Sequence, residues 1–385
     1  MKKNYSKFGT KAIHAGVEPD SATGAIMTPI YQTSTYVQEQ LGQHKGYAYS
    51  RSGNPTRNTL ENAIAELENA KYGVCFGSGM AAIDAVMKLL KPGDEVITSN
   101  DLYGGSYRIF TGIYANFGIN FHFIDMSDLS IVREKINDKT RLIWAETPTN
   151  PMMNIHDLEE LVKLKNGKEI LLAVDNTFAT PYLQNPICIG ADLVMHSVTK
   201  YLGGHSDVVM GAIATTNQSL ADEIYRIQNS SGAIPGPMDC FLVLRGLKTL
   251  HLRMQRHCEN GEQIAEFLAQ HPRVKNVYWP GFENHPGHAI AKKQMRNFGG
   301  MISFSLKSAG IESTKQVLEQ FKLFSLAESL GGVESLVCHP ATMTHGSIPE
   351  KERQAAGIVD SLIRLSVGVE DIDDLIEDLK QALAQ

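Results

Sequence analysis

Polar side chains follow the short apolar runs of this chain at places where they could take part in chemistry. The clearest case is SVTKYLGGHSD (197–207), which sets Lys200 among serine, threonine and glycine directly after the apolar run ADLVM (191–195). That run is expected to be a buried strand, and open α/β sheets hold their ligands just past the carboxyl ends of their strands. A lysine amine at such a place could act as a nucleophile or as a base.

Four other apolar runs are followed by further functional groups. GSGM (77–80) follows YGVCF (72–76) and opens a helical pattern, so the free N–H groups of a helix N-terminus would suit a phosphate. The remaining groups at strand ends are Tyr103 after EVITS (95–99), Asn150 after RLIWAE (141–146), Asp175 after EILLAV (169–174), and Ser197 and Thr199 beside Lys200.

Each group also has an ordinary structural interpretation. The glycines of GSGM fit a tight turn, Asp175 fits a helix N-cap, and Lys200 and Tyr103 fit solvated loop positions. The combination is more informative, because pyridoxal phosphate needs all of these groups at once. A lysine amine condenses with its aldehyde, a carboxylate keeps its pyridine nitrogen protonated, an aromatic ring stacks on it, and amides with hydroxyls bind its phosphate.

Two competing interpretations explain fewer of these residues. GSGMAA (77–82) resembles the GxGxxA fingerprint of dinucleotide-binding proteins, with Asp101 roughly 20 residues further on, which would suit an NAD(P)-dependent dehydrogenase. A non-catalytic binding protein of α/β type is the other alternative. Both leave Lys200 and Asp175 without a role, so the residues favour a pyridoxal-phosphate enzyme.

The composition favours a small-molecule partner. The chain of 385 residues has a formal net charge of −6, and its lysines and arginines are scattered, so neither nucleic acid nor an anionic membrane is expected as a partner. Five cysteines without a CxxC pair predict neither a disulfide framework nor a metal site, and they favour a reducing compartment. No signal-like segment and no run near ~18 apolar residues is found, so a cytoplasmic protein is expected.

The elements that would position these groups fall into three parts. Residues 1–60 lack apolar periodicity and are expected to form an extended arm, at whose end Asn54 caps a helix that begins with Pro55. Residues 61–245 alternate short apolar runs with helical patterns, which predicts an α/β domain with a mostly parallel sheet. Residues 246–385 predict a smaller α+β domain, with strands in VKNVYW, GMISFSL and LIRLSVG and a closing helix in DIDDLIEDLKQAL.

The chain resembles the pyridoxal-phosphate enzymes of Cys/Met metabolism, which include cystathionine γ-lyases, γ-synthases and β-lyases and methionine γ-lyases. The resemblance covers essentially the whole chain and is carried by YSRSGNPTR, FGSGMAA, DLYGGSYR, ETPTNP, VDNTFATPY, HSVTKYLGGHSDV, LRGLKTL, LAESLGGVESL and IRLSVGVED. It implies the aspartate aminotransferase-like fold type I, with a seven-stranded mixed, mostly parallel sheet in a large α/β domain and a small C-terminal α+β domain. It also implies a homotetramer built from active dimers.

The resemblance implies a role for each matching residue. The catalytic residues would be Lys200, which binds the cofactor covalently, Asp175, which contacts the pyridine nitrogen, and Tyr103, which stacks on the ring. The phosphate would be bound by Gly79, Met80, Ser197 and Thr199, completed by Tyr49 and Arg51 of the neighbouring subunit. The substrate would be bound by Arg364 at its α-carboxylate and by Asn150, Ser329, Glu328 and Arg108. From the sequence alone, Arg364 would be an exposed strand residue.

Three positions bear on the reaction within this family. Gly105 stands where methionine γ-lyases have a cysteine, and Glu328 stands where β-lyases tend to carry tyrosine, so both imply chemistry at Cγ of a cystathionine-like substrate. Ala48 departs from the family pattern, because γ-synthases and γ-lyases commonly have Asp or Glu there to hold the distal amino group. The expected reaction is γ-elimination on L-cystathionine, giving cysteine, 2-oxobutanoate and ammonia. The alternative is a γ-synthase that makes cystathionine from an O-acylhomoserine and cysteine.

Overall fold

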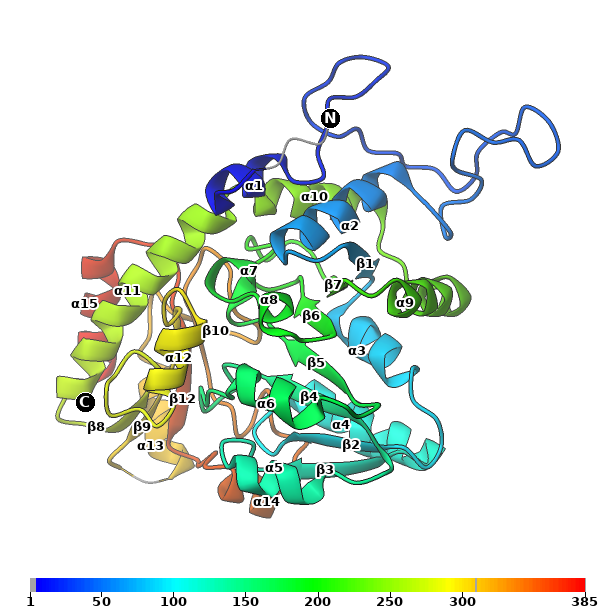
Figure 1. The fold of residues 1–385 in the computed structure, drawn as a ribbon. Coiled ribbons are helices and arrows are strands. Elements are labelled where there is room, and N and C mark those ends of the chain that lie inside the picture. Colours follow the sequence, from blue (N-terminus) through cyan, green and yellow to red (C-terminus); the bar gives the residue numbers. More distant parts are fainter. Residues whose placement is uncertain (1–4, 309, 385) are drawn as a thin grey trace.

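Two β-sheets and the helices around them make up the computed structural model, which describes residues 5–308 and 310–384 (Figure 1). The strands are β1 (Tyr72–Phe76), β2 (Glu95–Ser99), β3 (Asn120–Ile124), β4 (Thr140–Glu146), β5 (Leu171–Asp175), β6 (Leu193–Ser197), β7 (Gly211–Thr215), β8 (Val274–Tyr278), β9 (Met301–Leu306), β10 (Ser325–Leu326), β11 (Leu336–Cys338) and β12 (Leu362–Ser366). The helices are α1 (Phe8–His14), α2 (Pro55–Leu67), α3 (Gly79–Met87), α4 (Gly104–Gly112), the 3₁₀ helix η1 (Tyr114–Phe117), α5 (Leu129–Lys135), α6 (Leu158–Lys165), α7 (Thr180–Leu183), α8 (Pro186–Ile189), α9 (Gln218–Ser231), α10 (Pro237–Leu247), α11 (Leu250–Gln270), α12 (His288–Gln294), α13 (Ile311–Leu318), α14 (Glu350–Ala355) and α15 (Ile372–Ala382).

The large sheet has the strand order β1-β7-β6-β5-β4-β2-β3. Neighbouring strands from β6 to β3 are parallel, whereas β7 is antiparallel to both β1 and β6. Six strands therefore point the same way, and their carboxyl ends share one edge of the sheet. This arrangement confirms the predicted mixed, mostly parallel sheet.

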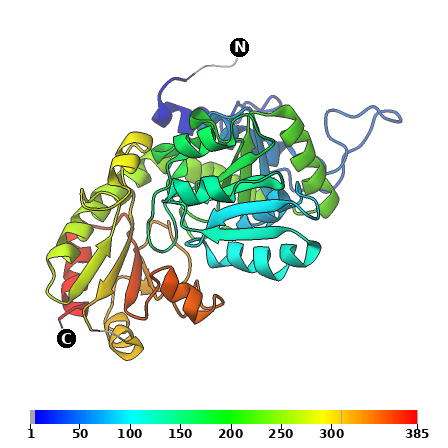
Figure 2. The same cartoon turned by 60° about the horizontal axis from the view of Figure 1, so that its bottom comes forward.

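Helices cover both faces of the large sheet (Figures 1 and 2). Successive side chains of a strand point to opposite faces. In β4, Trp144 packs with Phe110 of α4 and Ile83 of α3. The preceding residue, Ile143, packs in a different core together with Leu161 of α6. Burial on both faces explains why these strands are continuous apolar runs, and the predicted strands β1, β2, β4, β5 and β6 are confirmed.

The small sheet has the strand order β10-β11-β12-β9-β8, and it lies beside the large sheet with helices of its own (Figure 2). Its core combines Phe304 of β9 with Ile264 and Leu268 of α11 and with Leu375 and Leu379 of α15. In both helices these apolar residues are four positions apart, the spacing that aligns them on one face. The predicted α+β part is confirmed, while the domain boundaries near 60 and 245 stay predictions.

Some elements differ from the sequence-based expectation, which contains no strands for β3, β7, β10 and β11. β3 is only partly buried, β7 has small side chains (GAIAT), and β10 and β11 have two and three residues. The long helical pattern near 238–270 is divided into α10 and α11, because the chain leaves the helix at Lys248 and Thr249.

The N-terminal arm projects from the body as two long loops (Figure 1). Residues 15–54 contain neither a helix nor a strand, although the short helix α1 precedes them. Asn54 accepts hydrogen bonds from the backbone N–H groups of Thr56 (3.0 Å) and Arg57 (3.3 Å), and Pro55 is the first residue of α2. The predicted cap is therefore confirmed. None of the helices in the described residues has both the length and the apolar character needed to cross a membrane.

Candidate active site

A cavity of about 800 Å³ lies at the carboxyl edge of the large sheet, and residues between 327 and 344 together with Arg364 line its other side. The rest of the lining comes from strand ends, from α3, and from Tyr103 and Arg108 at the N-cap and in the first half of α4. The predicted site residues that the structure brings together here are Gly79, Met80, Tyr103, Arg108, Asn150, Asp175, Ser197, Thr199, Lys200, Glu328, Ser329 and Arg364.

Lys200 lies in the turn after β6 and is partly buried. Its Nζ donates a hydrogen bond of 2.6 Å to Ser329 Oγ. Burial, together with the nearby charge of Arg364, lowers the pKa of Lys200 to about 8, although Glu328 opposes the shift. With that pKa, roughly a tenth of the amine is neutral at pH 7, so Lys200 can act as a nucleophile and as a base.

Arg364 on β12 is buried, with 2% of its surface exposed, so the exposure expected from its strand pattern is wrong. Its guanidinium donates to Asn150 Oδ1 (2.7 Å) and to the carbonyl oxygen of Ser329 (3.0 Å). Its Nε is also buried and has no hydrogen-bond partner among the described residues. A buried guanidinium with a donor to spare suits a carboxylate ligand.

Ser329 connects Lys200 with Arg364. Its φ is +90°, a backbone conformation that residues other than glycine seldom adopt. Strained residues of this kind gather at functional sites. Here the hydroxyl of Ser329 faces Lys200 and its carbonyl oxygen faces Arg364, so the amine and the guanidinium lie around the same residue.

Asp175, the last residue of β5, has one carboxyl oxygen bound by Thr177. Its Oδ1 accepts hydrogen bonds from the backbone N–H (3.0 Å) and the hydroxyl of Thr177. Burial raises the pKa of Asp175, but the two bonds from Thr177 and the nearby His196 counteract this. Burial, and then the charge of Asp175, raises the pKa of Glu146 well above its usual range. We infer that the pair carries one negative charge, which the hydrogen bonds place on Asp175.

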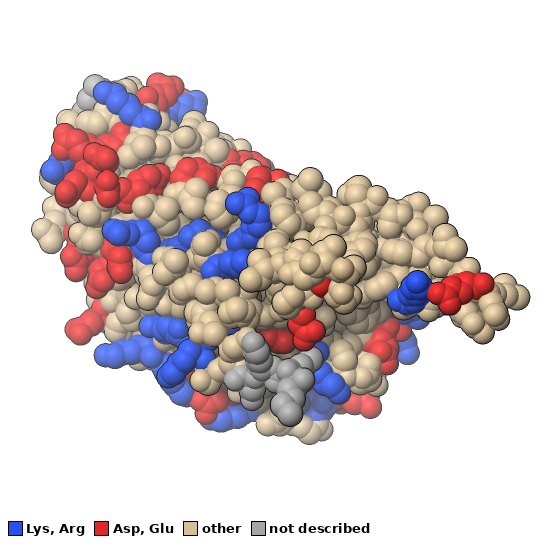
Figure 3. Space-filling view, turned by 90° about the horizontal axis from the view of Figure 1, so that it is seen from above, with Lys and Arg blue, Asp and Glu red and all other residues tan. Residues whose placement is uncertain are grey.

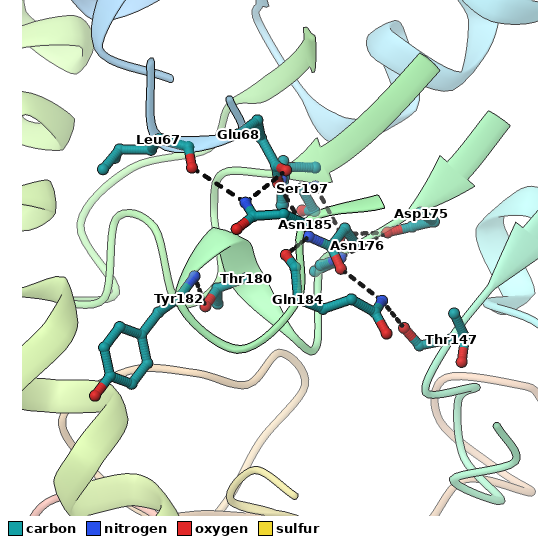
Figure 4. A network of polar contacts seen from close by, with 12 residues as sticks. Leu67, Glu68, Thr147, Asp175, Asn176, Thr180, Tyr182, Gln184, Asn185 and Ser197 are labelled. Atoms are coloured by element: carbon teal, nitrogen blue, oxygen red, sulfur yellow. Dashed lines mark hydrogen bonds and ion pairs between the residues drawn. The ribbon is translucent and has the colours of Figure 1, made fainter. Parts of the chain in front are cut away.

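A network of buried polar side chains surrounds Asn176, the residue that follows β5 (Figure 4). Asn176 donates to Glu68 Oε1 (3.0 Å) and to the carbonyl oxygen of Gln184 (2.9 Å). Gln184 in turn donates to Asn176 Oδ1 (2.9 Å), and Glu68 also bonds His196. These contacts fix the backbone directly after Asp175 and so set the direction of its carboxylate.

The N-terminus of α3 opens into the cavity. Ser78 caps the helix by accepting a hydrogen bond of 3.0 Å from the N–H of Ala81, and Gly79 and Met80 form its first turn at the cavity wall. Ser197 packs so closely that a Cβ atom on Gly79 would lie 3.0 Å from it. Backbone donors at a helix N-terminus make this end of the cavity suitable for a phosphate.

Three of the predicted phosphate ligands are placed less directly. Thr199 lines the cavity, but its hydroxyl already exchanges hydrogen bonds with the backbone of Met210 (3.0 and 3.2 Å). Tyr49 and Arg51 are exposed and do not line this cavity. Arg51 instead donates to the carbonyl oxygen of Asn229 in its own chain (2.7 Å). Their contact with a phosphate stays a prediction.

Tyr103 and Arg108 enter the cavity from α4 and its cap. The backbone N–H of Tyr103 donates to Glu146 Oε2 (2.9 Å). Gly105 leaves room for the Tyr103 ring, because a Cβ atom at position 105 would lie 2.3 Å from it. Arg108 lies on the more exposed side, where its Nη1 donates to Ser347 Oγ (3.2 Å). The two residues therefore occupy different parts of the same cavity.

Sequence reasoning missed several polar residues of the cavity. Glu146 is the last residue of β4, so the strand-end argument that singled out Asp175 could also have found it. Thr177, Asp207 and Glu334 also line the cavity. They lie in connecting segments within VDNTFATPY, HSVTKYLGGHSDV and LAESLGGVESL, so these motifs could have pointed to them. The part of the chain that the structure describes contains no cluster of three or more His, Cys, Asp or Glu side chains suited to a metal ion.

Comparison with known proteins identifies the family. The family model described as Cys/Met metabolism PLP-dependent enzyme matches residues 9–384. This chain belongs to that family. It is 53% identical to a cystathionine β-lyase of Coxiella burnetii, over 98% of both chains. A cystathionine γ-lyase of Dictyostelium discoideum is 52% identical, over 99% of this chain and 98% of the relative.

A solved structure extends the similarity to a third activity of the Cys/Met metabolism family. The cystathionine γ-synthase of Xanthomonas oryzae pv. oryzae, in complex with cystathionine, superposes with a TM-score of 0.96 at 42% identity, covering 99% of this chain and 98% of that one. The predicted fold type I is therefore confirmed. The names of the relatives divide among β-lyase, γ-lyase and γ-synthase, so family membership establishes a pyridoxal-phosphate enzyme without fixing its reaction.

The cavity fits the family's cofactor, pyridoxal 5′-phosphate. Lys200 offers an amine of lowered pKa, Asp175 a buried carboxylate, and α3 a helix N-terminus for the phosphate. These three groups match the aldehyde, the pyridine nitrogen and the phosphate of the cofactor. The roles of the individual residues stay predictions.

The pKa of Lys200 leads to a testable pH dependence. Only the neutral amine is nucleophilic, and the neutral fraction rises as the pH passes through about 8. The rate at which apoenzyme captures pyridoxal phosphate should therefore rise about tenfold from pH 6 to 7 and level off above about pH 9. Stopped-flow absorbance measures this rate, and Nα-acetyl-lysine, whose only amine is a side chain with a pKa of about 10.4, is the control that keeps rising beyond pH 9. A capture rate that follows Nα-acetyl-lysine would show that Lys200 is not perturbed.

Proposed function

We propose that this chain catalyses γ-elimination on L-cystathionine, which yields cysteine, 2-oxobutanoate and ammonia. The observation that carries the proposal is the arrangement at Ser329, with the amine of Lys200 on its hydroxyl and the guanidinium of Arg364 on its carbonyl oxygen. An amino acid whose α-carboxylate binds Arg364 would hold its Cα next to Lys200. That placement serves removal of the Cα proton.

Proton transfer is the work of Lys200. Bound pyridoxal phosphate supplies an electron sink for the charge left at Cα. Because its pKa is about 8, the Lys200 amine can accept the Cα proton near neutral pH, pass it on to the bound cofactor and, neutral again, accept one from Cβ. The sulfur then leaves Cγ and takes up a proton to give the thiol of cysteine. Asp175 keeps a negative charge at the pyridine end, and Tyr103 assists proton transfer from the side of α4.

Arg108 and Glu328 support a substrate with two amino-acid ends. Arg364 and Arg108 reach the cavity from β12 and α4, so one guanidinium is available for each carboxylate of cystathionine. Glu328 lines the same cavity and offers a carboxylate to an ammonium group. Ala48 has no carboxylate for the distal ammonium group of cystathionine. We therefore propose that Arg108 and Glu328 select the distal end of the substrate, and that the missing carboxylate at position 48 broadens the range of substrates.

A cystathionine γ-synthase is the second candidate. The likeness to the Xanthomonas enzyme in complex with cystathionine favours it. Both reactions use the same proton transfers at Cα and Cβ, and they differ in whether water or cysteine completes the cycle. The preference for the lyase rests on GLKTLHLRM and IRLSVGVED, which look most similar to that branch.

We also propose a cytoplasmic homotetramer of two active dimers, in which Tyr49 and Arg51 reach the phosphate of the neighbouring subunit. Residues 21–38 of the arm contain no Lys, Arg, Asp or Glu, and Ile26 and Val37 are 83% and 91% exposed. Figure 3 shows a broad uncharged area on the face from which the arm projects. Exposed apolar surface of this kind supports an interface between subunits.

The reaction is tested by measuring kcat/KM side by side. Cystathionine cleavage, with the 2-oxo acid identified, is compared with cysteine-dependent cystathionine formation from O-acetyl- and O-succinylhomoserine. The proposal predicts 2-oxobutanoate as the product and the cleavage rate as the highest. A synthesis rate tenfold or more above cleavage, about 1.4 kcal/mol in transition-state stabilisation, would make the chain a synthase. Pyruvate as the main product would place the cleavage at Cβ.

A further inference from the structure

Asn54 and Arg57 of the YSRSGNPTR motif do not line the cavity, yet both are 2% exposed. Charged and amide side chains are seldom buried unless their polar atoms are bound. Arg57 lies in the first turn of α2, and Asn54 is the residue before that helix. Both face the turn formed by residues 49–51, which carries Tyr49 and Arg51.

The contacts of these two residues go to the backbone and side chains of the arm. The guanidinium of Arg57 donates to the carbonyl oxygen of Ser50 (2.9 Å) and to that of Arg51 (3.1 Å). The side-chain amide of Asn54 donates to Ser50 Oγ (3.2 Å) and to the carbonyl oxygen of Tyr31 (2.9 Å). Two consecutive carbonyl groups bound by one guanidinium leave the turn little freedom, because the planar fork fixes both distances.

Arg57, which holds this turn, is itself anchored in the body of the subunit. Arg57 Nε lies 3.6 Å from Glu61 Oε1, and both side chains are buried. Glu61 Oε1 also accepts hydrogen bonds from the N–H of Cys75 on β1 (3.0 Å) and from Gln228 on α9 (3.3 Å). The turn is thus tied to α2, and α2 is tied to the large sheet. Tyr49 and Arg51 remain exposed at the end of this connection.

We propose that Arg57 and Asn54 are positioning residues for the neighbouring subunit's site. They hold residues 49–51 so that Tyr49 and Arg51 can contact the phosphate of the partner's cofactor. For this contact the Arg51 side chain leaves the carbonyl oxygen of Asn229, to which it now donates (2.7 Å). Their effect is therefore exerted in trans, on a cavity to which neither of them belongs. This inference rests on the proposed sharing of the arm between subunits.

Mixed dimers provide the test. In the Arg57→Met homodimer both phosphate sites lose a correctly held arm, so the affinity for pyridoxal phosphate, measured by fluorescence, should fall tenfold or more. In a purified dimer of one Arg57→Met chain and one Lys200→Ala chain, one site combines an intact Lys200 with an intact arm. About half of the wild-type activity and of the visible cofactor band should return.

The controls separate the possible failures. An Arg51→Ala chain mixed with Lys200→Ala tests the sharing itself, and no recovery there would reject the shared site and this inference together. Recovery with Arg51→Ala but not with Arg57→Met would show that Arg57 acts within its own subunit, which overturns the inference alone. Wild-type cofactor affinity in the Arg57→Met homodimer would overturn it as well. Arg226→Met, at an exposed arginine of α9, should change nothing.

Asn54→Asp decides the question if the Arg57→Met chain does not fold. Aspartate can still accept the hydrogen bonds from the N–H groups of Thr56 and Arg57, so the cap of α2 is kept. It cannot donate to Ser50 or Tyr31, so the hold on the turn is weakened. A mixed dimer of one Asn54→Asp chain and one Lys200→Ala chain should therefore recover about half of the wild-type activity and of the cofactor band. Loss of cofactor affinity without recovery would reject the positioning role.

Discussion

Lys200→Ala should abolish the visible absorption band of the bound cofactor and lower kcat by at least about 10³-fold. The substitution removes both the covalent attachment and the base, and a positioned acid or base alone contributes about 10² to 10⁴ in rate. Ser329 would lose the donor that now lies 2.6 Å from its hydroxyl, but the carbonyl contact with Arg364 would remain. Substrate binding should therefore decline much less than turnover. Absorbance of the reconstituted protein measures the loss of the band, and steady-state kinetics measure the changes in kcat and KM.

Lys88→Ala is the matched control, because Lys88 is exposed at the C-cap of α3 and pairs with Asp84 of that helix. It should keep the band and the turnover of the wild type. If Lys200→Ala retained the band, or kept more than about a tenth of the wild-type kcat, the assignment of the amine would be wrong.

Asp175→Asn should bind pyridoxal phosphate covalently yet turn over about 10² to 10³ times more slowly. Removing one preorganised electrostatic group from a buried site has effects of this size. The carboxylate accepts two hydrogen bonds from Thr177, and we infer that it carries the single negative charge it shares with Glu146. A neutral amide cannot keep the pyridine nitrogen protonated, so the cofactor would be a weaker electron sink. The band should persist because Lys200 is unchanged.

Asp222→Asn, at an exposed carboxylate on α9, should leave both the band and the turnover unchanged. Near-wild-type turnover of Asp175→Asn with an intact band would contradict the electrostatic role. Asp175 would then serve only to hold the turn at Thr177.

The strands of the large sheet were predictable where both of their faces are buried. RLIWAE forms β4 beside the middle strand β5, and YGVCF forms the edge strand β1, whose residues from Gly73 to Phe76 are all buried. β7 was not predictable by the same argument, because GAIAT has small side chains and follows β6 without a helix between them. The rule of alternating strands and helices applies to parallel crossovers, whereas β7 returns antiparallel to β6.

The lining of the cavity was predictable where residues stand at the end of a strand or a few positions after it. Lys200 and Asp175 follow this rule, since parallel strands bring their carboxyl ends to one edge. The strand-end rule does not predict Arg364 as a residue of the cavity. Its burial depends on Asn150, 214 residues away in the sequence, and on Ser329, and only tertiary contact creates that environment. A strand arginine considered without those partners is expected to be exposed.

The pair Arg57 and Glu61 illustrates the same limit in another way. Opposite charges four residues apart on a helix usually form a weak surface ion pair. Here β1 supplies the N–H of Cys75 to Glu61 and the arm supplies two carbonyl groups to Arg57, so the pair becomes buried. Nothing in the spacing of the two residues indicates those partners.

The most direct test of the site is to find which residue carries the cofactor. Wild-type protein reconstituted with pyridoxal phosphate is reduced with borohydride, digested, and mapped by mass spectrometry. The site described here predicts the reduced cofactor on the peptide that contains Lys200, with one cofactor per chain. Attachment to any other lysine, or no attachment in protein that shows full activity, would contradict it.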